Sequence, residues 1–374
     1  AMTVDARAMV EQAVADLHAG RLDEAEVAAD ALAELAQTRA TGLRLLAQVR
    51  TRRGEPREAL ELLTLAAQAA PADPGPLLEA AALLQRHGRH DEALDHYRRA
   101  HLLDPADGYA RELLTQGHQE RALHLLTGQR LGRESSKGHA ARVYSGFVRT
   151  WLSGRHVLDV GYRGGYGDTD TVVPHAIGVD TGYPGYDGVH LPFPDESQDA
   201  VHSSHCLEHI PDTTAVIREW FRVLRVGGYL VTIVPHQYLY ERRRALPARN
   251  PEHCHLFTPA TLLAAFERAL PPNAYRVRHL ADNDLFYDYA LPNDTHPVGC
   301  YEIELVIERI AQPAWTLRTA RVAWIQENAA AHEDAMQLRY QRRYPTHVEV
   351  LAARAALAGE AFIDIAFHRG LPEA

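Results

Sequence analysis

Two acids and a glycine-rich turn near the middle of the chain have the types and spacing of a nucleoside-binding pocket. A buried strand predicted at 156–160 runs into a turn with several glycines at 161–165, and a second apolar run at 176–179 ends at Asp180. Glycines let the backbone approach a ligand closely, and an acid about 20 residues further on can accept hydrogen bonds from ribose hydroxyls. Asp159, just before the turn, would repel a pyrophosphate. The pattern therefore favours a nucleoside that carries positive charge.

Two histidines are candidate catalytic residues because each follows a predicted strand. His205 comes after the strand predicted at 199–203, and His236 comes after the one at 229–234. In an open α/β sheet, ligands bind at the carboxyl ends of the strands. A histidine titrates near neutral pH and can remove a proton from a hydroxyl group. We predict that at least one of the two contacts substrate as a base, and a structural role for either one remains open.

The same region contains the string H-x-x-E-H, formed by His205, Glu208 and His209. On a helix this string is a zinc-binding signature. Such a site needs both histidines on one helix and a third ligand, whereas residues 204–209 are predicted to span a strand end and a helix start. We therefore predict no metal site from this string.

The turn after the first predicted strand resembles the first motif of the class I S-adenosylmethionine (SAM)-dependent methyltransferases, [DE]-x-G-x-G-x-G. Asp159, Gly161 and Gly165 stand at matching positions, and Arg163 replaces the middle glycine. The resemblance implies a Rossmann-like α/β domain with a mostly parallel seven-stranded sheet and an antiparallel final strand. It also implies SAM as the cofactor.

The resemblance continues at 181–212, where a D-x-x-x-L-P-F run precedes a strand and implies that Asp187 or its backbone contacts adenine. The residues expected to bind the cofactor are Asp159, Gly161, Tyr162, Arg163, Gly165, Asp180, Thr181, Asp187, Gly188 and Ser204.

The N-terminal third of the sequence repeats itself. Gly20, Gly54 and Gly88 begin similar segments and are spaced 34 residues apart. This period resembles the tetratricopeptide repeat (TPR), in which a glycine permits the turn between antiparallel helices. The resemblance implies an all-α repeat domain whose concave surface binds a protein partner or pairs two subunits of a homodimer. Docking on the catalytic domain is the alternative.

These patterns divide the chain into four predicted segments. The TPR-like repeats occupy 1–127, a polar linker 128–138, the methyltransferase domain 139–312 and a C-terminal helical extension 313–374.

Composition and charge narrow the classes of function. The net charge of −10 argues against nucleic acid as the main partner, because phosphate binding needs concentrated positive charge. We found no membrane-length apolar run and no signal peptide before the first predicted helix, and the three cysteines are scattered, so we expect a cytoplasmic protein. Lys137 is the single lysine, which disfavours Schiff-base or Walker-type chemistry.

The expected reaction is O-methylation of a hydroxyl on a sugar, a glycan or a secondary metabolite. The combination of a SAM domain with TPR repeats resembles bacterial proteins of cell-surface glycan or natural-product biosynthesis. Two alternatives remain open. The first, favoured by Arg163, is a catalytically inactive scaffold that recruits partners. The second is a non-methylating enzyme that uses its histidines for acid–base or metal chemistry.

Overall fold

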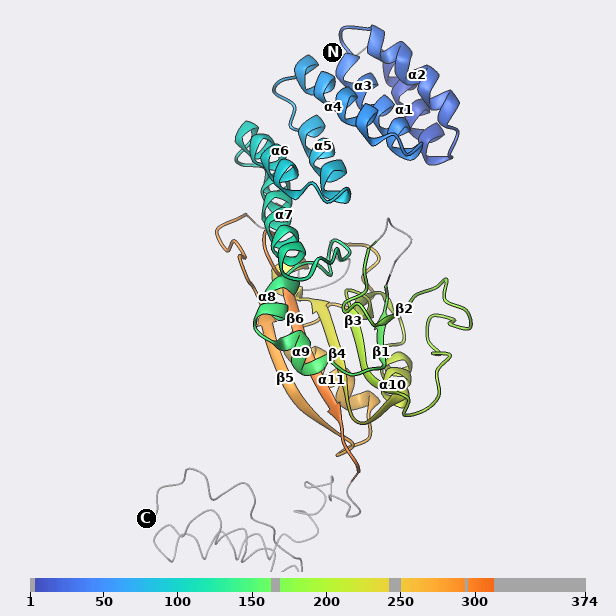
Figure 1. The fold of residues 1–374 in the computed structure, drawn as a ribbon, viewed down its shortest axis with the longest axis vertical. Coiled ribbons are helices and arrows are strands. Elements are labelled where there is room, and N and C mark those ends of the chain that lie inside the picture. Colours follow the sequence, from blue (N-terminus) through green and yellow to red (C-terminus); the bar gives the residue numbers. More distant parts are fainter. Residues whose placement is uncertain (1–3, 163–168, 242–249, 293–294, 313–374) are drawn as a thin grey trace, which may run out of the picture. The chain divides into compact units, whose positions relative to one another are not determined.

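The computed structural model describes residues 4–162, 169–241, 250–292 and 295–312 (Figure 1). The predicted C-terminal extension, 313–374, lies outside the described residues.

Seven helices make up the N-terminal part of the chain. They are α1 (Val4–His18), α2 (Leu22–Glu34), α3 (Arg39–Arg52), α4 (Pro56–Ala69), α5 (Gly75–Arg86), α6 (His90–Leu103) and α7 (Gly108–Thr127). The turns between α1 and α2, α3 and α4, and α5 and α6 each contain a glycine at positive φ, namely Gly20, Gly54 and Gly88. L-residues rarely adopt this conformation, and glycine adopts it freely. The predicted TPR-like helical repeats are thereby confirmed.

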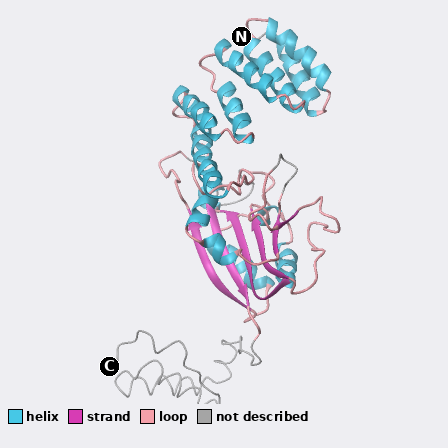
Figure 2. Ribbon diagram, viewed as in Figure 1, coloured by secondary structure: helices cyan, strands magenta, loops and turns pink. Residues whose placement is uncertain are grey.

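A sheet of six strands follows (Figure 2). The strands are β1 (Val157–Val160), β2 (Ile177–Val179), β3 (Gln198–Ser204), β4 (Leu224–Pro235), β5 (Tyr275–Asn283) and β6 (Glu302–Arg309). Their order is β2-β1-β3-β4-β6-β5, with β2, β1, β3 and β4 parallel and β6 antiparallel to both of its neighbours.

The predicted fold class, a mostly parallel Rossmann-like sheet with an antiparallel final strand, is confirmed. The described residues contain six strands instead of the expected seven. The segment between β2 and β3, residues 180–197, forms turns and bends only. This segment connects β2 directly to the parallel strand β3, without the helix and strand that the family pattern implies between them.

Helices cover the two faces of the sheet because its strands are apolar on both sides. The helices are α8 (His139–Tyr144), α9 (Phe147–Trp151), α10 (Thr213–Val223) and α11 (Pro259–Ala269), with the short helices η1 (Leu207–His209) and η2 (Gln237–Glu241) at strand ends. Leu158 and Val160 pack in one core with side chains of α10 and α11. Val157 points to the other core, which α9 covers.

The segment between α7 and α8, residues 128–138, contributes a fully buried lysine. Lys137 Nζ lies 2.6 Å from Glu112 Oε1 on α7, and Glu112 Oε2 accepts a hydrogen bond of 2.8 Å from the Gly299 backbone N–H before β6. The side chain of Lys137 is 0% exposed. Buried polar contacts therefore join α7, the last repeat helix, to the residues just before β6.

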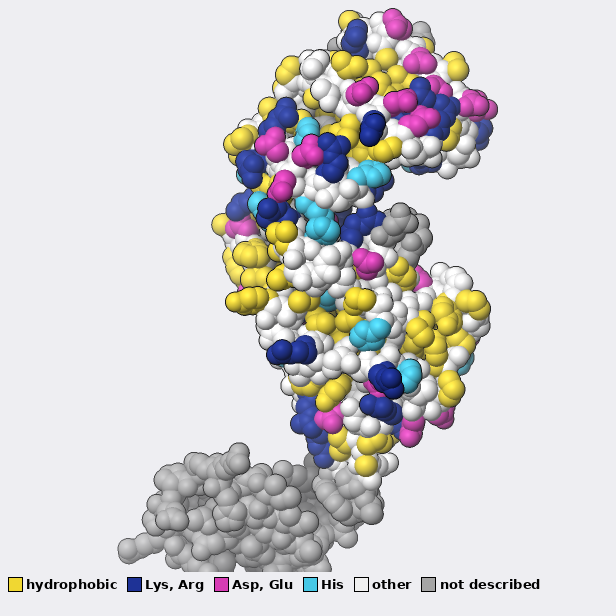
Figure 3. All heavy atoms as spheres, in the orientation of Figure 1, with side chains coloured by type: hydrophobic (Ala, Val, Ile, Leu, Met, Phe, Trp, Pro, Cys, Tyr) yellow, Lys and Arg dark blue, Asp and Glu magenta, His cyan; other side chains and the backbone are white. Residues whose placement is uncertain are grey.

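On the face shown in Figure 3, basic and acidic side chains are interspersed over the repeat helices. None of the described helices combines the length and apolar character needed to cross a bilayer.

Candidate active site

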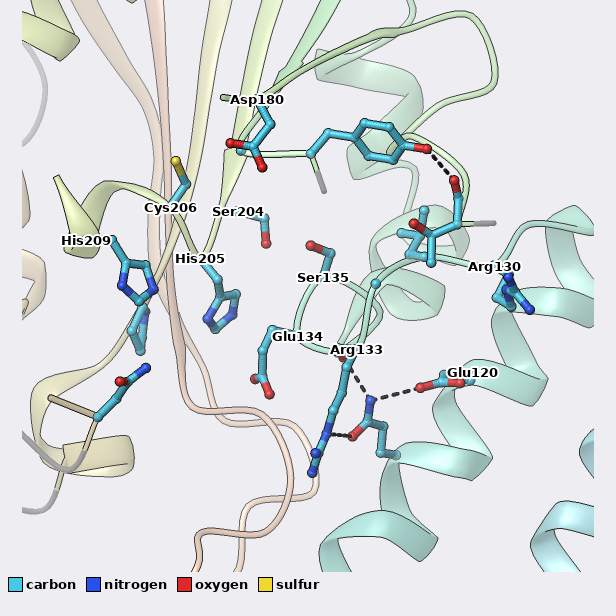
Figure 4. Close-up of a pocket in the computed structure, with 18 of the residues that line it drawn as sticks. Glu120, Arg130, Arg133, Glu134, Ser135, Asp180, Ser204, His205, Cys206 and His209 are labelled. Atoms are coloured by element: carbon cyan, nitrogen blue, oxygen red, sulfur yellow. Dashed lines mark hydrogen bonds between the residues drawn. The ribbon is translucent and has the colours of Figure 1, made fainter. Parts of the chain in front are cut away.

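A large cavity lies at the carboxyl ends of β1 and β3. Its volume is about 1070 Å³, and its wall includes side chains from the sheet, from residues 130–135 and from helices α5, α6 and α7. We call it the central cavity. Figure 4 shows Asp180, Ser204 and His205 along one side, with Arg133 and Glu134 nearby. Side chains of the helical repeats and of the sheet thus line one cavity.

Eight of the predicted site residues line the central cavity. They are Asp159, Gly161, Tyr162, Asp180, Thr181, Gly188, Ser204 and His205. Arg163 and Gly165 lie outside the described residues. Asp187 and His236 are absent from the described wall of the cavity.

Asp159, at the end of β1, is buried and engaged by the protein through both of its oxygens. Oδ2 accepts a hydrogen bond of 2.8 Å from the Val172 backbone N–H, and Oδ1 lies 2.7 Å from His202 Nδ1 on β3. Asp159 thus holds the chain after the glycine turn against β1. Its expected contact with a cationic ligand stays a prediction.

Gly161 begins the turn with a φ of +87°. Its N–H donates to the Val179 carbonyl at 2.8 Å, and a Cβ at this position would lie 2.6 Å from Cys206 Cβ. Only glycine fits this position without strain, so the turn packs closely against the residues that follow β3. Tyr162, the next residue, donates its hydroxyl hydrogen to the Thr169 carbonyl.

Asp180 follows β2 and lies at the cavity wall, where one of its oxygens accepts a hydrogen bond of 2.7 Å from the Thr181 N–H. Asp187 is directed into its own turn instead. Its oxygens accept from the backbone N–H groups of Val189 and His190 and lie 2.8 Å from His190 Nδ1. The hydrogen bond from His190 is the largest cause of a lowered pKa for Asp187.

His205 is a partly buried residue in the wall of the cavity, with a side chain that is 10% exposed and a φ of +50°. Its Nε2 lies 3.1 Å from Glu302 Oε1, and its Nδ1 lies 3.8 Å from Glu208 Oε1. Burial acts to lower the pKa of His205, but the hydrogen bond to Glu302 and the charges of Glu208 and Glu302 outweigh it, so the pKa is raised. Beside it, Ser204 has an Oγ without a hydrogen-bond partner in the described chain.

His236 lies at the end of β4, where its backbone N–H donates to the Tyr301 carbonyl. Its Nδ1 accepts a hydrogen bond of 3.0 Å from the Tyr238 N–H, and its Nε2 lies 3.5 Å from Asp282 Oδ1 on β5. Burial lowers the pKa of His236. The two predicted catalytic histidines are therefore separated, because His205 faces the cavity and His236 faces the β5 side.

The wall beyond His205 holds a group that the sequence patterns did not bring together. Ligand atoms of Glu208, His209 and His253 all lie within 4.8 Å of one another. Glu208 and His209 belong to η1, while His253 comes from the segment before α11. Only the H-x-x-E-H string indicated part of this cluster, and the string does not include His253.

Comparisons with known proteins match part of this region to methyltransferases. Residues 183–232 match a family model described as a methyltransferase domain. Over 134 residues the chain is 33% identical to a probable S-adenosylmethionine-dependent methyltransferase of Mycolicibacterium smegmatis. That match covers 31% of this chain and 52% of the relative, so the chain spans about half the length of the curated relative that it matches.

Solved structures give weaker matches. A putative methyltransferase of Bacillus halodurans has 14% identity and a TM-score of 0.34, covering 46% of this chain and 98% of that one. PcrH of Pseudomonas aeruginosa has 21% identity and a TM-score of 0.28, covering 32% of this chain and 90% of its own. The predicted resemblance to SAM-dependent methyltransferases is confirmed by the family model and by the relative from Mycolicibacterium smegmatis.

Proposed function

We propose that the protein is a SAM-dependent methyltransferase that methylates a hydroxyl of a sugar, a glycan or a secondary metabolite. The observation that carries the proposal is that Asp180, Gly161 and His205 share the wall of one cavity. Part of that wall, including Gly188, Ser204 and His205, lies within the segment that matches the methyltransferase family.

The residues at the sheet end of the central cavity fit the cofactor. A carboxylate after the second strand accepts hydrogen bonds from ribose hydroxyls, and Asp180 has this position. The buried Oγ of Ser204, which lacks a partner in the described chain, is available to a ligand. When bound, SAM supplies a methyl group on a positively charged sulfur, and the protein's part is to position the acceptor and take its proton.

His205 is the residue that we assign to proton removal. Its Nε2 is paired with Glu302, so Nδ1 is the atom that accepts the acceptor's proton. The imidazolium formed in this way is stabilised by two buried carboxylates, Glu302 and Glu208. His236 is absent from the described cavity wall and lies beside Asp282 instead, so we assign it a structural role.

The acceptor is expected to occupy the rest of the cavity, toward the repeat helices. The volume of about 1070 Å³ is slightly above the roughly 300–1,000 Å³ typical of small-molecule sites. Its far wall includes Tyr97, Tyr109 and Arg133, and Arg133 lies 5.5 Å from the centre of the Tyr109 ring. Aromatic faces beside polar groups suit a sugar ring, and this lining supports a glycan or glycosylated acceptor.

Calorimetric titration with S-adenosylhomocysteine tests the cofactor site of the full-length protein. We expect one binding site, and about a tenfold to hundredfold weaker affinity for Asp180→Asn, because hydrogen bonds to a charged group contribute roughly 1.5–3 kcal/mol. His205→Ala is expected to retain binding and to lose methyl transfer from labelled SAM to hydroxyl acceptors. Absence of heat at high protein concentration would instead support the inactive scaffold.

We further propose that the repeats bind a protein partner or a second copy of the chain. Leu102 and Leu125, on α6 and α7, are 69% and 67% exposed, which supports such a contact. Sedimentation velocity of the wild type beside Leu102→Ser/Leu125→Ser tests it. A dimer that the double variant disrupts is the result expected for self-association, and a monomer in both would overturn the dimer.

A further inference from the structure

Glu208, His209 and His253 form a compact group at the cavity wall, beyond His205. Their ligand atoms, one from each side chain, lie within 4.8 Å of one another. All three residues line the central cavity. The geometry points to a binding site for a divalent transition metal ion, held by the Glu208 carboxylate and the Nε2 atoms of the two histidines.

Glu208 provides the first argument. Its side chain is 0% exposed, and neither carboxylate oxygen has a hydrogen-bond partner in the part of the chain that the structure describes. Buried polar groups in folded proteins are nearly always paired, and a buried carboxylate without a partner is costly. A bound cation would satisfy both the charge and the lone pairs of Glu208.

The hydrogen bonds of the histidines provide the second argument. His253 Nδ1 lies 2.6 Å from Glu241 Oε1, and His209 Nδ1 lies 3.1 Å from the Glu252 carbonyl oxygen. Both oxygens can only accept, so Nδ1 carries the hydrogen in each ring and Nε2 keeps its lone pair. Metal-binding histidines usually donate their second N–H to a carboxylate or a carbonyl in this way.

The spacing of the ligand atoms excludes a simpler explanation. His209 Nε2 lies 3.8 Å from Glu208 Oε1, which is too far for a hydrogen bond. Two ligands that each lie about 2.1 Å from one metal ion are separated by roughly 3–4 Å. The observed spacing therefore suits ligands around a common ion, after small side-chain rotations, better than a hydrogen-bonded cluster.

Two histidines and one carboxylate are a ligand set for zinc, iron, manganese or cobalt, and they leave coordination positions open. Glu208 and His209 of the H-x-x-E-H string take part in this site together with His253, and His205 is not one of its ligands. If the proposed methyl transfer is correct, on which this step rests, an open position would bind the acceptor hydroxyl. The ion would then lower the pKa of that hydroxyl beside His205, whose Nδ1 lies 3.8 Å from Glu208.

The test uses Co²⁺ as the probe, because its visible absorption reports the ligands directly. The full-length protein is treated with a chelator, dialysed and titrated with Co²⁺. We expect bands that saturate at one equivalent and that disappear when Zn²⁺ is added. Glu208→Gln and His253→Ala should give no bands at one equivalent. His190→Ala, which removes a surface histidine paired with Asp187, is the matched control and should keep them.

Binding of S-adenosylhomocysteine shows whether each variant is folded and separates this proposal from the function proposed above. A variant that binds the nucleoside and gives no Co²⁺ bands supports the metal site. His209→Ala is a second variant, at a residue that is one-third exposed and therefore less critical for folding. Wild-type protein without bands, or bands that persist in Glu208→Gln and His253→Ala, would overturn the site whatever the outcome for the cofactor.

Discussion

Replacing Lys137 by methionine should destabilise the folded protein strongly, although the residue lies in a segment of polar sequence. The ammonium group lies 2.6 Å from Glu112 Oε1, 3.2 Å from Glu134 Oε2 and 4.0 Å from the centre of the Tyr301 ring. Methionine keeps most of the length and volume of the side chain. The substitution therefore removes the charge with little change in packing.

The size of the effect follows from how the two acids are buried. The Glu112 side chain is 1% exposed and would be left as a buried, unpaired carboxylate, whereas that of Glu134 is 39% exposed and can be hydrated. Removing one partner of a buried ion pair typically costs about 3–5 kcal/mol. We expect a loss of this order in the free energy of unfolding at pH 7.

The cost should depend on pH in a direction that identifies its cause. Burial raises the pKa of Glu112 above 4.5, and Lys137 opposes that rise. Without Lys137 the folded-state pKa rises further, so the folded state is penalised wherever the unfolded chain is ionised, above about pH 4.5. The difference between wild type and Lys137→Met should shrink as the pH falls toward 4.5.

Urea unfolding at several pH values measures this difference. Arg121→Met is the control, because Arg121 pairs with Asp91 at the surface and such pairs contribute at most about 1 kcal/mol. Adding Glu112→Gln to Lys137→Met should recover part of the loss. A cost below about 1 kcal/mol at pH 7, or one that does not change with pH, would refute the assignment of Lys137 as an essential buried partner.

Three further outcomes can be measured. The raised pKa of His205 predicts that kcat/KM for methyl transfer increases with pH, with a midpoint above 6.5, and His205→Ala should lower it about 10²–10⁴-fold. Gly161→Ala should lower stability by at least about 1 kcal/mol in urea, since it combines positive φ with a clash against Cys206, whereas Gly182→Ala, where the space is open, should be nearly neutral. Burial lowers the pKa of His139 to about 3, so below pH 6.5 the unfolded chain binds a proton at this histidine that the folded protein does not bind. The free energy of unfolding should therefore fall from pH 6.5 toward pH 3, and it should fall less steeply in His139→Gln.

The repeats and the sheet could be predicted because their signals are local. A glycine every 34 residues marks turns that need positive φ, as Gly54 shows, and continuous apolar runs mark parallel strands buried on both faces. The number of strands was less predictable. The expected seventh strand came from the family pattern, whereas the segment 180–197 of this chain connects β2 to β3 without it.

The sequence could predict which residues line the cavity only where their position along a strand decides this. Asp159 lies in the last part of β1, Asp180 and His205 directly follow β2 and β3, and all three line the cavity. For the other predicted residues, the direction of the side chain decides whether it reaches the cavity, and no sequence pattern encodes that direction. Asp187 binds its own turn through His190. His236 follows a strand end as His205 does, yet it turns toward the neighbouring strand β5.

The largest difference between sequence and structure concerns what the repeats do for the site. Polar composition at 128–138 suggested a linker, but burial of Lys137 depends on Glu112 and Tyr301, which are distant in sequence and invisible to local patterns. The same segment and the repeat helices form the far wall of the central cavity. If the repeat array only recruited partners, buried charged groups that connect the array to the sheet would not be required. Because Lys137 joins the array to the residues just before β6, its loss should alter acceptor affinity as well as stability. The affinity for S-adenosylhomocysteine, whose proposed contacts lie at the sheet end, should change little.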